Sequence, residues 1–362
     1  MSKKLIVLFL TVVVFVGISG GYVVGGLQAY FRYQHTLSCG GQSPVHICVP
    51  QLSQSPILSA FYPSYVARHI PLFTIGYSSD SPKTLEISVS ITGFSQVQTQ
   101  TVNATPTPQS VNFTPPLKSH NVLLNLTADE STFLHVQVTD LQAHLFYVSD
   151  SMLVLLSRWK MQWQASTLSQ IAAWITPDDP AIGSLVAKAA AHLPQETPPA
   201  PDAMIGYNGG NATPQDVKDQ VDAIFDALRL DYHMSYVQED IQYGGPRDTK
   251  PASQLVKLPA EVLQQHSGMC VELTVLLASA VERIGLHAEL IIIPDHMFLG
   301  VAVTPDNKQF EYWDTVLVNK NDAGESANIL TDNTYAKNLK QNTIIDTILI
   351  SDARIAGIGP IL

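Results

Sequence analysis

Charged residues are scarce in this sequence. Of its 362 residues, 14% are charged and 46% are hydrophobic, whereas a soluble globular chain usually has about 25% charged residues. This balance excludes a disordered acidic tail or a solvating linker, because both are rich in charge and poor in apolar residues. The length is enough for two domains, or for one domain with attached segments, each able to bury its own core.

Positive charge in particular is lacking. The chain has 20 Lys and Arg against 31 Asp and Glu, which gives a net charge of −11. The two signs balance in residues 1–150, so the whole negative excess lies in residues 151–362. Because the sequence offers no basic patch to neutralise a phosphate backbone, we do not expect it to bind nucleic acid.

A long uncharged and apolar stretch opens the chain. No charged residue occurs in residues 5–31, and Lys3 and Lys4 precede them. A helix needs about 20 apolar residues to cross a bilayer, and the two lysines favour a cytoplasmic N-terminus. We therefore expect residues 1–31 to be a cytoplasmic stub and a transmembrane signal anchor. Residues 5–27 would lie in the lipid bilayer, and the rest of this single-pass protein would be outside the cytoplasm.

A cleaved signal peptide is the alternative interpretation of the same stretch. Small residues at positions 17–20 follow a compact apolar region, as they do at signal-peptide cleavage sites. The apolar run continues over residues 22–27, which favours the anchor. In both cases the body of the protein is extracytoplasmic, either anchored in the cell membrane or secreted.

Cysteine is rare, and the number of cysteines, three, is odd. Cys39 and Cys48 lie close together in a stretch that contains Gly and Pro, and in an oxidising compartment we expect a disulfide between them. Two unpaired thiols are the alternative. Cys270 then remains alone in the C-terminal half. A lone thiol outside the cytosol is either buried as a small hydrophobic residue or used in chemistry.

Two periodicities divide the rest of the chain. Residues 32–55 are interpreted as an extracytoplasmic tether. In residues 56–156 apolar side chains alternate with polar ones, most strictly over residues 84–91. This pattern predicts an antiparallel β-sandwich of immunoglobulin-like type. Helical signals follow, so residues 157–362 are expected to form a second domain.

Capping signals predict where the first two helices of the second domain begin. Asp179 followed by Pro180 starts one helix, and Thr213 followed by Pro214 starts the next. Acidic residues recur along the second helix at spacings of three and four. They are interpreted as its solvent-exposed face, and they are Asp216, Asp219, Asp222 and Asp226.

Cys270 begins a strongly apolar helix. Residues 258–263 are expected to form a short helix, and a turn then leads to Cys270 and a helix over residues 271–284 that ends at Gly285. Because this helix is apolar nearly all round, it is expected to be buried. Free backbone N–H groups and the helix dipole at its N-terminus would favour a thiolate. An inert core cysteine is the alternative.

A predicted hairpin brings a histidine and a carboxylate together. Extended runs are expected over residues 296–303 and 310–318, joined by a turn. With a short loop, paired positions have numbers that sum to about 610–611, so His296 lies opposite Asp314 or Thr315. A cysteine at a helix N-terminus, a histidine and an orienting carboxylate are the components of a catalytic triad.

These motifs, in this order, resemble the transglutaminase-like superfamily of papain-type cysteine enzymes. The resemblance rests on residues 268–272, on the buried helix that ends at Gly285, on the strand with His296 and on residues 312–315. It covers roughly residues 213–318, and three motifs in the same order are more specific than any one of them.

The resemblance implies an α+β papain-like fold for the second domain and a role for three residues. Cys270 would be the nucleophile, His296 the general base and acid, and Asp314 the residue that holds the imidazole. The implied reaction is acyl transfer from an amide through a thioester. The expected partner is a protein or peptide substrate, and cell-envelope material is one candidate for it. Water as acceptor gives a peptidase or amidase, and an amine gives cross-linking. We expect hydrolysis, because nothing in the sequence marks a site for an acceptor lysine.

Acyl transfer also needs donors to the oxyanion. The backbone N–H of Cys270 is one expected donor, and the side chain of Gln264, Gln265 or Tyr243 is the second. Glu272 is expected to be a structural carboxylate, because its position on the helix does not bring it to the face of Cys270. No cofactor and no metal are expected, because no pair of His or Cys has the spacing of metal ligands.

A catalytically inactive binding or scaffold module at the cell surface is the alternative function for the same fold. Members of the superfamily usually have an aromatic residue after the cysteine, where this chain has Val271. A small residue and an aromatic often follow the histidine, where this chain has Met297 and Phe298. The spacing from Cys270 to His296 is also short.

Overall fold

The computed structural model describes most of the chain after the expected membrane anchor. The described residues are 37–40, 44–52, 56–144, 146–165, 167–193, 201, 203–239, 252–319 and 323–361. The predicted stub and transmembrane segment, residues 1–31, lie outside the described residues. Among the residues that are described, no helix is both long enough and apolar enough to cross a membrane.

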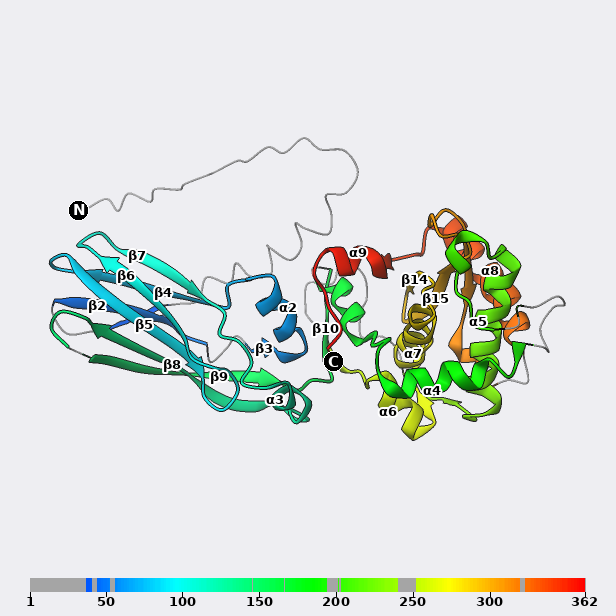
Figure 1. Cartoon of the computed structure of the whole chain (residues 1–362), viewed down its shortest axis with the longest axis horizontal. Coiled ribbons are helices and arrows are strands. Elements are labelled where there is room, and N and C mark those ends of the chain that lie inside the picture. Colours follow the sequence, from blue (N-terminus) through cyan, green and yellow to red (C-terminus); the bar gives the residue numbers. More distant parts are fainter. Residues whose placement is uncertain are drawn as a thin grey trace.

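The N-terminal part of the chain consists of two β-sheets packed as a sandwich (Figure 1). One sheet has the order β1-β2-β4-β7 and the other β3-β9-β8-β5-β6. Neighbouring strands are antiparallel, except that β3 and β9 are parallel. The bounds are β1 Leu37–Gly40, β2 Val45–Pro50, β3 Ile57–Leu58, β4 Phe73–Ser79, β5 Lys83–Ile91, β6 Gln98–Ala104, β7 Gln109–Phe113, β8 Glu130–Asp140 and β9 Phe146–Leu156.

The core of the sandwich follows the alternation expected from the sequence. On β5, Leu85, Ile87 and Val89 are fully buried, and the residues between them are partly exposed. Successive side chains of a strand point to opposite faces of its sheet, so the apolar set lies between the two sheets. An antiparallel sandwich is therefore present in this part of the chain.

The sandwich begins earlier than expected. Residues 32–55, interpreted as a tether, contain β1 and β2 of the first sheet. On β2, Val45, Ile47 and Val49 are buried against the second sheet. The tether interpretation is wrong for these two strands, because the Gly- and Pro-containing turns around them obscured a short period-two pattern.

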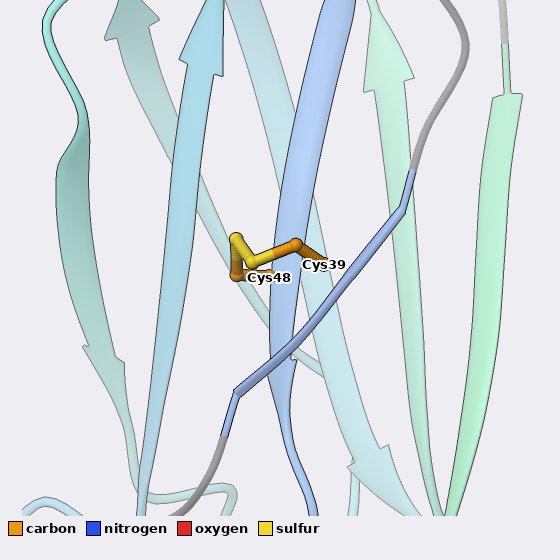
Figure 2. Close-up of a disulfide and its surroundings, with 2 residues drawn as sticks. All are labelled: Cys39 and Cys48. Atoms are coloured by element: carbon orange, nitrogen blue, oxygen red, sulfur yellow. A yellow bond between two sulfur atoms is a disulfide. The ribbon is translucent and has the colours of Figure 1, made fainter. Parts of the chain in front are cut away.

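Cys39 and Cys48, expected to pair, form a disulfide across β1 and β2 (Figure 2). The two cysteines are directly opposite in the strand register, with Cα atoms 4.0 Å apart. Cys48 in turn lies opposite Gly76 on β4. A β-carbon at Gly76 would be 3.2 Å from the Cys48 Cβ, so the glycine leaves room for the bridge.

The C-terminal part is built on a four-stranded antiparallel sheet with helices on both faces (Figure 1). Its order is β16-β15-β14-β17, with β14 Ala288–Ile293, β15 His296–Ala302, β16 Phe310–Trp313 and β17 Asp346–Leu349. Helix α7 (Cys270–Arg283) packs on one face, against Met297 and Leu299 of β15. Helix α8 (Gly324–Gln341) covers the other face, where Tyr335 packs on Phe298 and Tyr312.

The remaining elements surround this sheet and helix α7. The α-helices are α4 Pro180–Ala189, α5 Pro214–Leu230, α6 Pro259–Gln265 and α9 Ile350–Ile355. Two short strand pairs are β10 Lys160–Trp163 with β12 Ala252–Leu255, and β11 Ser235–Tyr236 with β13 Ser267–Gly268. The 3-10 helices are η2 Leu168–Trp174, η4 Asn208–Gly210 and η5 Thr315–Asn319.

The predicted helix starts at positions 180 and 214 are confirmed. Asp179 caps α4 by accepting a hydrogen bond from the Ala181 N–H at 2.8 Å. Thr213 and Asp216 form a reciprocal capping box at the start of α5. These starts were predictable because a cap depends on a few consecutive residues.

The two parts of the chain meet through packed side chains and hydrogen bonds. Short helices η1 (Ser59–Phe61), α2 (Tyr62–Ala67) and α3 (His120–Leu124) lie at the end of the sandwich nearest the C-terminal part (Figure 1). The rings of Phe61 and Trp174 contact edge to face at 5.8 Å. The Ser157 N–H donates to Asp129 across the expected boundary at 3.0 Å. The buried apolar residues of both parts form one continuous cluster.

The acidic residues of α5 are not its exposed face. Asp219, Asp222 and Asp226 are buried, and Asp216 is half-buried. Asp222 accepts a hydrogen bond from the Trp313 Nε1 at 2.6 Å, and Asp226 accepts one from the Gly324 N–H at 3.0 Å. The prediction was wrong because α5 packs against α8 and η5, so its polar stripe faces neighbours rather than water.

Candidate active site

Cys270 is the first residue of α7 and is fully buried. Glu272 stabilises this helix start, because its Oε2 accepts the Met269 N–H at 3.1 Å. The other carboxylate oxygen accepts the Lys257 N–H at 2.9 Å. Glu272 thus holds the backbone before the helix, which agrees with the structural role predicted from the sequence. The free N–H groups of this terminus favour a negative charge on the sulfur.

Gly268 allows the close packing that places Cys270. A β-carbon at Gly268 would lie 3.1 Å from a methyl group of Val262 and 3.2 Å from Leu273. Such contacts are tighter than side chains normally tolerate, so the chain passes between α6 and α7 because this residue has no side chain. The predicted helices on both sides of the turn are confirmed, with α6 ending at a left-handed His266.

His296 starts β15 directly after a tight turn. Ile293 and His296 are paired across the hairpin of β14 and β15, and Asp295 in the turn has a positive φ of 62°. The His296 Nε2 lies 2.8 Å from the Asp314 Oδ2. Because this contact uses Nε2, the Nδ1 atom is the ring nitrogen available to the thiol of Cys270.

The protonation of His296 depends on both of its partners. Burial by itself would lower the pKa of this imidazole, but hydrogen bonds to Asp314 and Cys270, and then their charges, raise the pKa to about 10. At neutral pH the ring is therefore protonated when the neighbouring groups are negative. A thiolate–imidazolium pair with an orienting carboxylate is the arrangement that nucleophilic cysteine chemistry uses.

The hairpin register differs from the predicted one. Leu299 pairs with Trp313, so paired numbers sum to 612 rather than 610–611. If this pairing continued by one residue, Phe298 would lie opposite Asp314. His296 lies two residues before Phe298 on the same strand, so it contacts the Asp314 carboxylate diagonally rather than directly across the hairpin. Diagonal neighbours are still within reach of long side chains. The predicted contact is present, although the pairing that was to produce it is shifted.

The second extended run is shorter than expected. β16 ends at Trp313, and residues 315–319 form η5 rather than more strand. Asp314 causes the change, because its Oδ1 accepts the Val316 N–H at 3.0 Å and its carbonyl accepts the Leu317 N–H at 3.2 Å. One carboxylate oxygen thus turns the backbone while the other holds His296.

A polar row on α8 holds the strand that carries Asp314. β16 is an edge strand, so one side of its backbone has no neighbouring strand in the sheet. Asn328 donates to the Tyr312 carbonyl at 3.1 Å, and Asp332 accepts the Tyr312 N–H at 2.9 Å. Thr331 accepts the Asp314 N–H at 2.9 Å. Sequence analysis missed this row, although the spacing of three and four is a signal of one helix face.

The oxyanion candidates lie in different places. Gln264 and Gln265 are exposed, and Gln265 accepts a hydrogen bond from Lys257 at 3.1 Å. Tyr243 lies outside the described residues. Gln254, which sequence analysis did not consider, is buried, and its Nε2 lies 3.3 Å from the Met269 sulfur, next to Cys270 in the chain. A buried glutamine has no local sequence signal that marks it.

The described residues contain no cluster of three or more His, Cys, Asp or Glu that could hold a metal ion. The three expected triad residues, in contrast, come together from α7, β15 and the end of β16.

Comparison with known proteins assigns this region to a family. Residues 207–347 match the family model of the transglutaminase-like superfamily. The match includes Cys270, His296 and Asp314, and it extends beyond both ends of the predicted region. No curated protein matches the chain. The resemblance is therefore confirmed, and the C-terminal region of this chain is a transglutaminase-like domain of mixed α and β structure.

Proposed function

We propose that this domain is a cysteine enzyme that cleaves amide bonds through an acyl-thioester on Cys270. The observation that carries the proposal is the 2.8 Å contact of His296 with Asp314, together with the interaction with Cys270 that helps to raise the pKa of His296. The superfamily match supports a cysteine-based enzyme fold, and the triad supports the chemistry.

In the first half of the reaction, the Cys270 thiolate attacks the carbonyl carbon of the amide. The carbonyl oxygen becomes an oxyanion, for which the Cys270 N–H is one donor and the Gln254 amide is the best-placed side chain among the candidates above. His296 gives its Nδ1 proton to the leaving amine as the C–N bond breaks, and a thioester and a neutral imidazole remain.

In the second half, His296 takes a proton from water, and the resulting hydroxide attacks the thioester. The C–S bond breaks, the carboxylic acid leaves, and the thiolate–imidazolium pair is restored. Asp314 transfers no proton in this scheme. It keeps Nε2 occupied, so that Nδ1 faces the sulfur, and it stabilises the imidazolium.

We propose hydrolysis rather than transfer to an amine. The proposed substrate is a protein or peptide, and cell-envelope material is one candidate.

The protein is further proposed to act outside the cytoplasm as a single-pass membrane protein. The apolar stretch after Lys3 and Lys4 supports the anchor. The Cys39–Cys48 disulfide supports an oxidising compartment. Protease added to intact cells should then digest the chain after residue 32, and a mature N-terminus near residue 20 would instead indicate secretion.

A catalytically inactive scaffold is the competing function, and one observation favours it. Cys270 is 0% exposed, whereas a nucleophile must be reached by its substrate. Val271 and Met297, which depart from the superfamily pattern, are consistent with that alternative.

The deciding experiment is acylation by an activated ester or amide, followed by intact-mass measurement. An adduct on the wild-type chain that is absent from Cys270→Ala supports the enzyme. Decay of the adduct in water, without added amine, supports hydrolysis. A folded wild-type chain that forms no adduct with any acyl donor supports the scaffold function.

A further inference from the structure

A short segment outside the triad covers the buried thiol. Residues 235–239, called the cover segment here, run beside the turn that precedes α7. The Ser235 N–H donates to the His266 carbonyl at 2.9 Å, and the Val237 N–H donates to the Gly268 carbonyl at 2.9 Å. β11 and β13 thereby form a short parallel pair. These two bonds hold the segment against the chain directly before the nucleophile.

Glu239, the last residue of the cover segment, makes two contacts with the site. Its backbone carbonyl lies 3.8 Å from the Cys270 Sγ, within range of a weak hydrogen bond from the thiol. Its side-chain Oε1 accepts a hydrogen bond from the Gln254 Nε2 at 3.2 Å. One residue therefore engages both the nucleophile and the buried amide beside it.

The carbonyl contact has a chemical consequence for the sulfur. A carbonyl oxygen accepts a hydrogen bond from S–H, so it stabilises the thiol. The Glu239 carbonyl also occupies space 3.8 Å from the sulfur, so no substrate group can lie there at the same time. The contact thus opposes access to Cys270.

We propose that Glu239 is an autoinhibitory residue that keeps Cys270 covered until the cover segment withdraws. Withdrawal exposes the sulfur and breaks the hydrogen bond from Gln254 in one movement, because Glu239 makes both contacts. The proposal rests on the function proposed above, and it narrows the acyl donor to an extended peptide. Such a donor can replace the Glu239 carbonyl at the sulfur with a carbonyl of its own.

The test is the rate at which iodoacetamide alkylates the full-length, disulfide-intact chain. Two of the three cysteines are in the disulfide, so the reaction reports Cys270 alone. Glu239→Ala removes the side-chain anchor of the cover segment. The open fraction, and with it the alkylation rate, should rise about tenfold, which is the effect of losing one hydrogen bond to a charged group.

Two control variants separate the anchor from a general charge effect. Glu239→Gln keeps an oxygen that accepts the Gln254 hydrogen bond but loses the charge, so its alkylation rate should rise clearly less than that of Glu239→Ala. Glu130→Ala removes an exposed glutamate from the sandwich, and its rate should equal that of wild type. Equal rates for Glu239→Ala and wild type overturn the proposal. A wild-type rate equal to that of the urea-unfolded chain also overturns it.

Failure of this proposal and failure of the proposed function give different results. The Glu239→Ala effect is measured again with His296→Ala in the same chain. If the cover segment controls access, Glu239→Ala accelerates alkylation in both backgrounds. If His296 activates the sulfur, His296→Ala slows alkylation of the opened site. If Glu239→Ala and the double variant with His296→Ala are alkylated at the same rate, the triad is contradicted, but the proposal for the cover segment is not.

Discussion

The sandwich and the C-terminal domain bury different kinds of side chain. Among the described residues of the sandwich, one carboxylate is buried, Asp140, and Lys83 pairs with it at 2.8 Å. The described part of the C-terminal domain buries five, which are Asp219, Asp222, Asp226, Glu272 and Glu289. Burial of a carboxylate costs free energy unless hydrogen bonds replace its water. Buried carboxylates are therefore concentrated in the domain that carries the candidate active site.

Several of these buried carboxylates hold the backbone of the site. Glu272 fixes the start of α7, Asp222 holds the Trp313 ring next to Asp314, and Asp226 binds the first N–H of α8. The sandwich, in contrast, is stabilised mainly by apolar packing between its sheets. Substitutions in the two regions should therefore affect different properties of the protein.

The largest effect is expected at the triad. His296→Ala should slow the acylation of Cys270 on the order of 10²–10⁴-fold, because the base that activates the thiol and the acid that protonates the leaving amine are both lost. Asp314→Ala should have a milder effect, because this residue orients the ring without transferring a proton. Rates of adduct formation, measured by mass, check both variants.

Thermal unfolding is the control for these two variants, because Asp314 also turns the backbone after β16. If both variants are folded and Cys270 reacts as fast as in wild type, there is no triad. The buried carboxylates of the C-terminal domain would then support a fold without a catalytic site.

The sandwich should show the opposite behaviour. Ile87→Ala removes a fully buried side chain from β5, and we expect it to lower the free energy of unfolding by about 2–5 kcal/mol. Urea unfolding should show a lower midpoint with an unchanged slope. Acylation of Cys270 in the folded variant should keep its wild-type rate. A large loss of acylation in folded protein would show that the two regions are not functionally separate.

A pH-dependent effect is expected at Glu289, on the α8 side of the sheet. Burial raises the pKa of Glu289 to about 7, although a hydrogen bond from Tyr312 opposes the shift. Gly300 makes room for this carboxyl, since a β-carbon there would lie 2.7 Å from the Glu289 Cγ. Glu289 thus binds its proton more tightly in the folded state than in the unfolded state, where its pKa is near the model-compound value of about 4.3.

The stability contributed by protonated Glu289 is therefore present below about pH 4.3 and is lost as the pH rises to about 7. Glu289→Gln replaces the acid by a neutral group of similar shape, and it should reduce this loss by up to about 3 kcal/mol. Asp332, whose pKa burial also raises to about 7, retains its own contribution. Urea midpoints at pH 5 and pH 7.5 measure the difference. A variant with the same pH dependence as wild type would contradict the prediction.

The smallest effect is expected at the α8 row. Thr331→Val keeps the shape of the side chain and removes the oxygen that accepts the Asp314 N–H. Loss of one such bond corresponds to about 1 kcal/mol, so acylation should slow roughly fivefold. Thr334→Val is the matched control, because it removes a similar hydroxyl bond, to the Leu330 carbonyl, and leaves the Asp314 contact in place. Equal rates for the two variants would mean that α8 does not position Asp314.

Features that depend on neighbouring residues in the chain could be predicted well. The caps at Asp179 and Thr213, the alternation on β5 and the helix that begins at Cys270 all rest on local backbone preferences. The hairpin could be predicted in outline. Its register could not, because the loop conformation that fixes the pairing of Leu299 with Trp313 is not determined by loop length alone.

Features that depend on distant residues could not be predicted in this way. Polar side chains on α5 have the spacing of an exposed face, and only the packing of α8 and η5 makes Asp222 and Asp226 buried. The same holds for Gln254, which is distant in sequence from its partner Trp163 and binds the Trp163 Nε1 at 2.8 Å. An exposed and a buried amide look alike in a sequence.

The sequence by itself determined the residue types of the site and the local elements that carry them. Cys270 begins a helix and His296 begins a strand because caps, turns and apolar periodicity act over a few residues. Only the tertiary structure decided that Asp314 meets His296 along a diagonal, that α8 supports that strand, and that Glu239 lies against the sulfur. These contacts join segments far apart in the chain. Their geometry is set by the packing of whole elements, which no local pattern encodes.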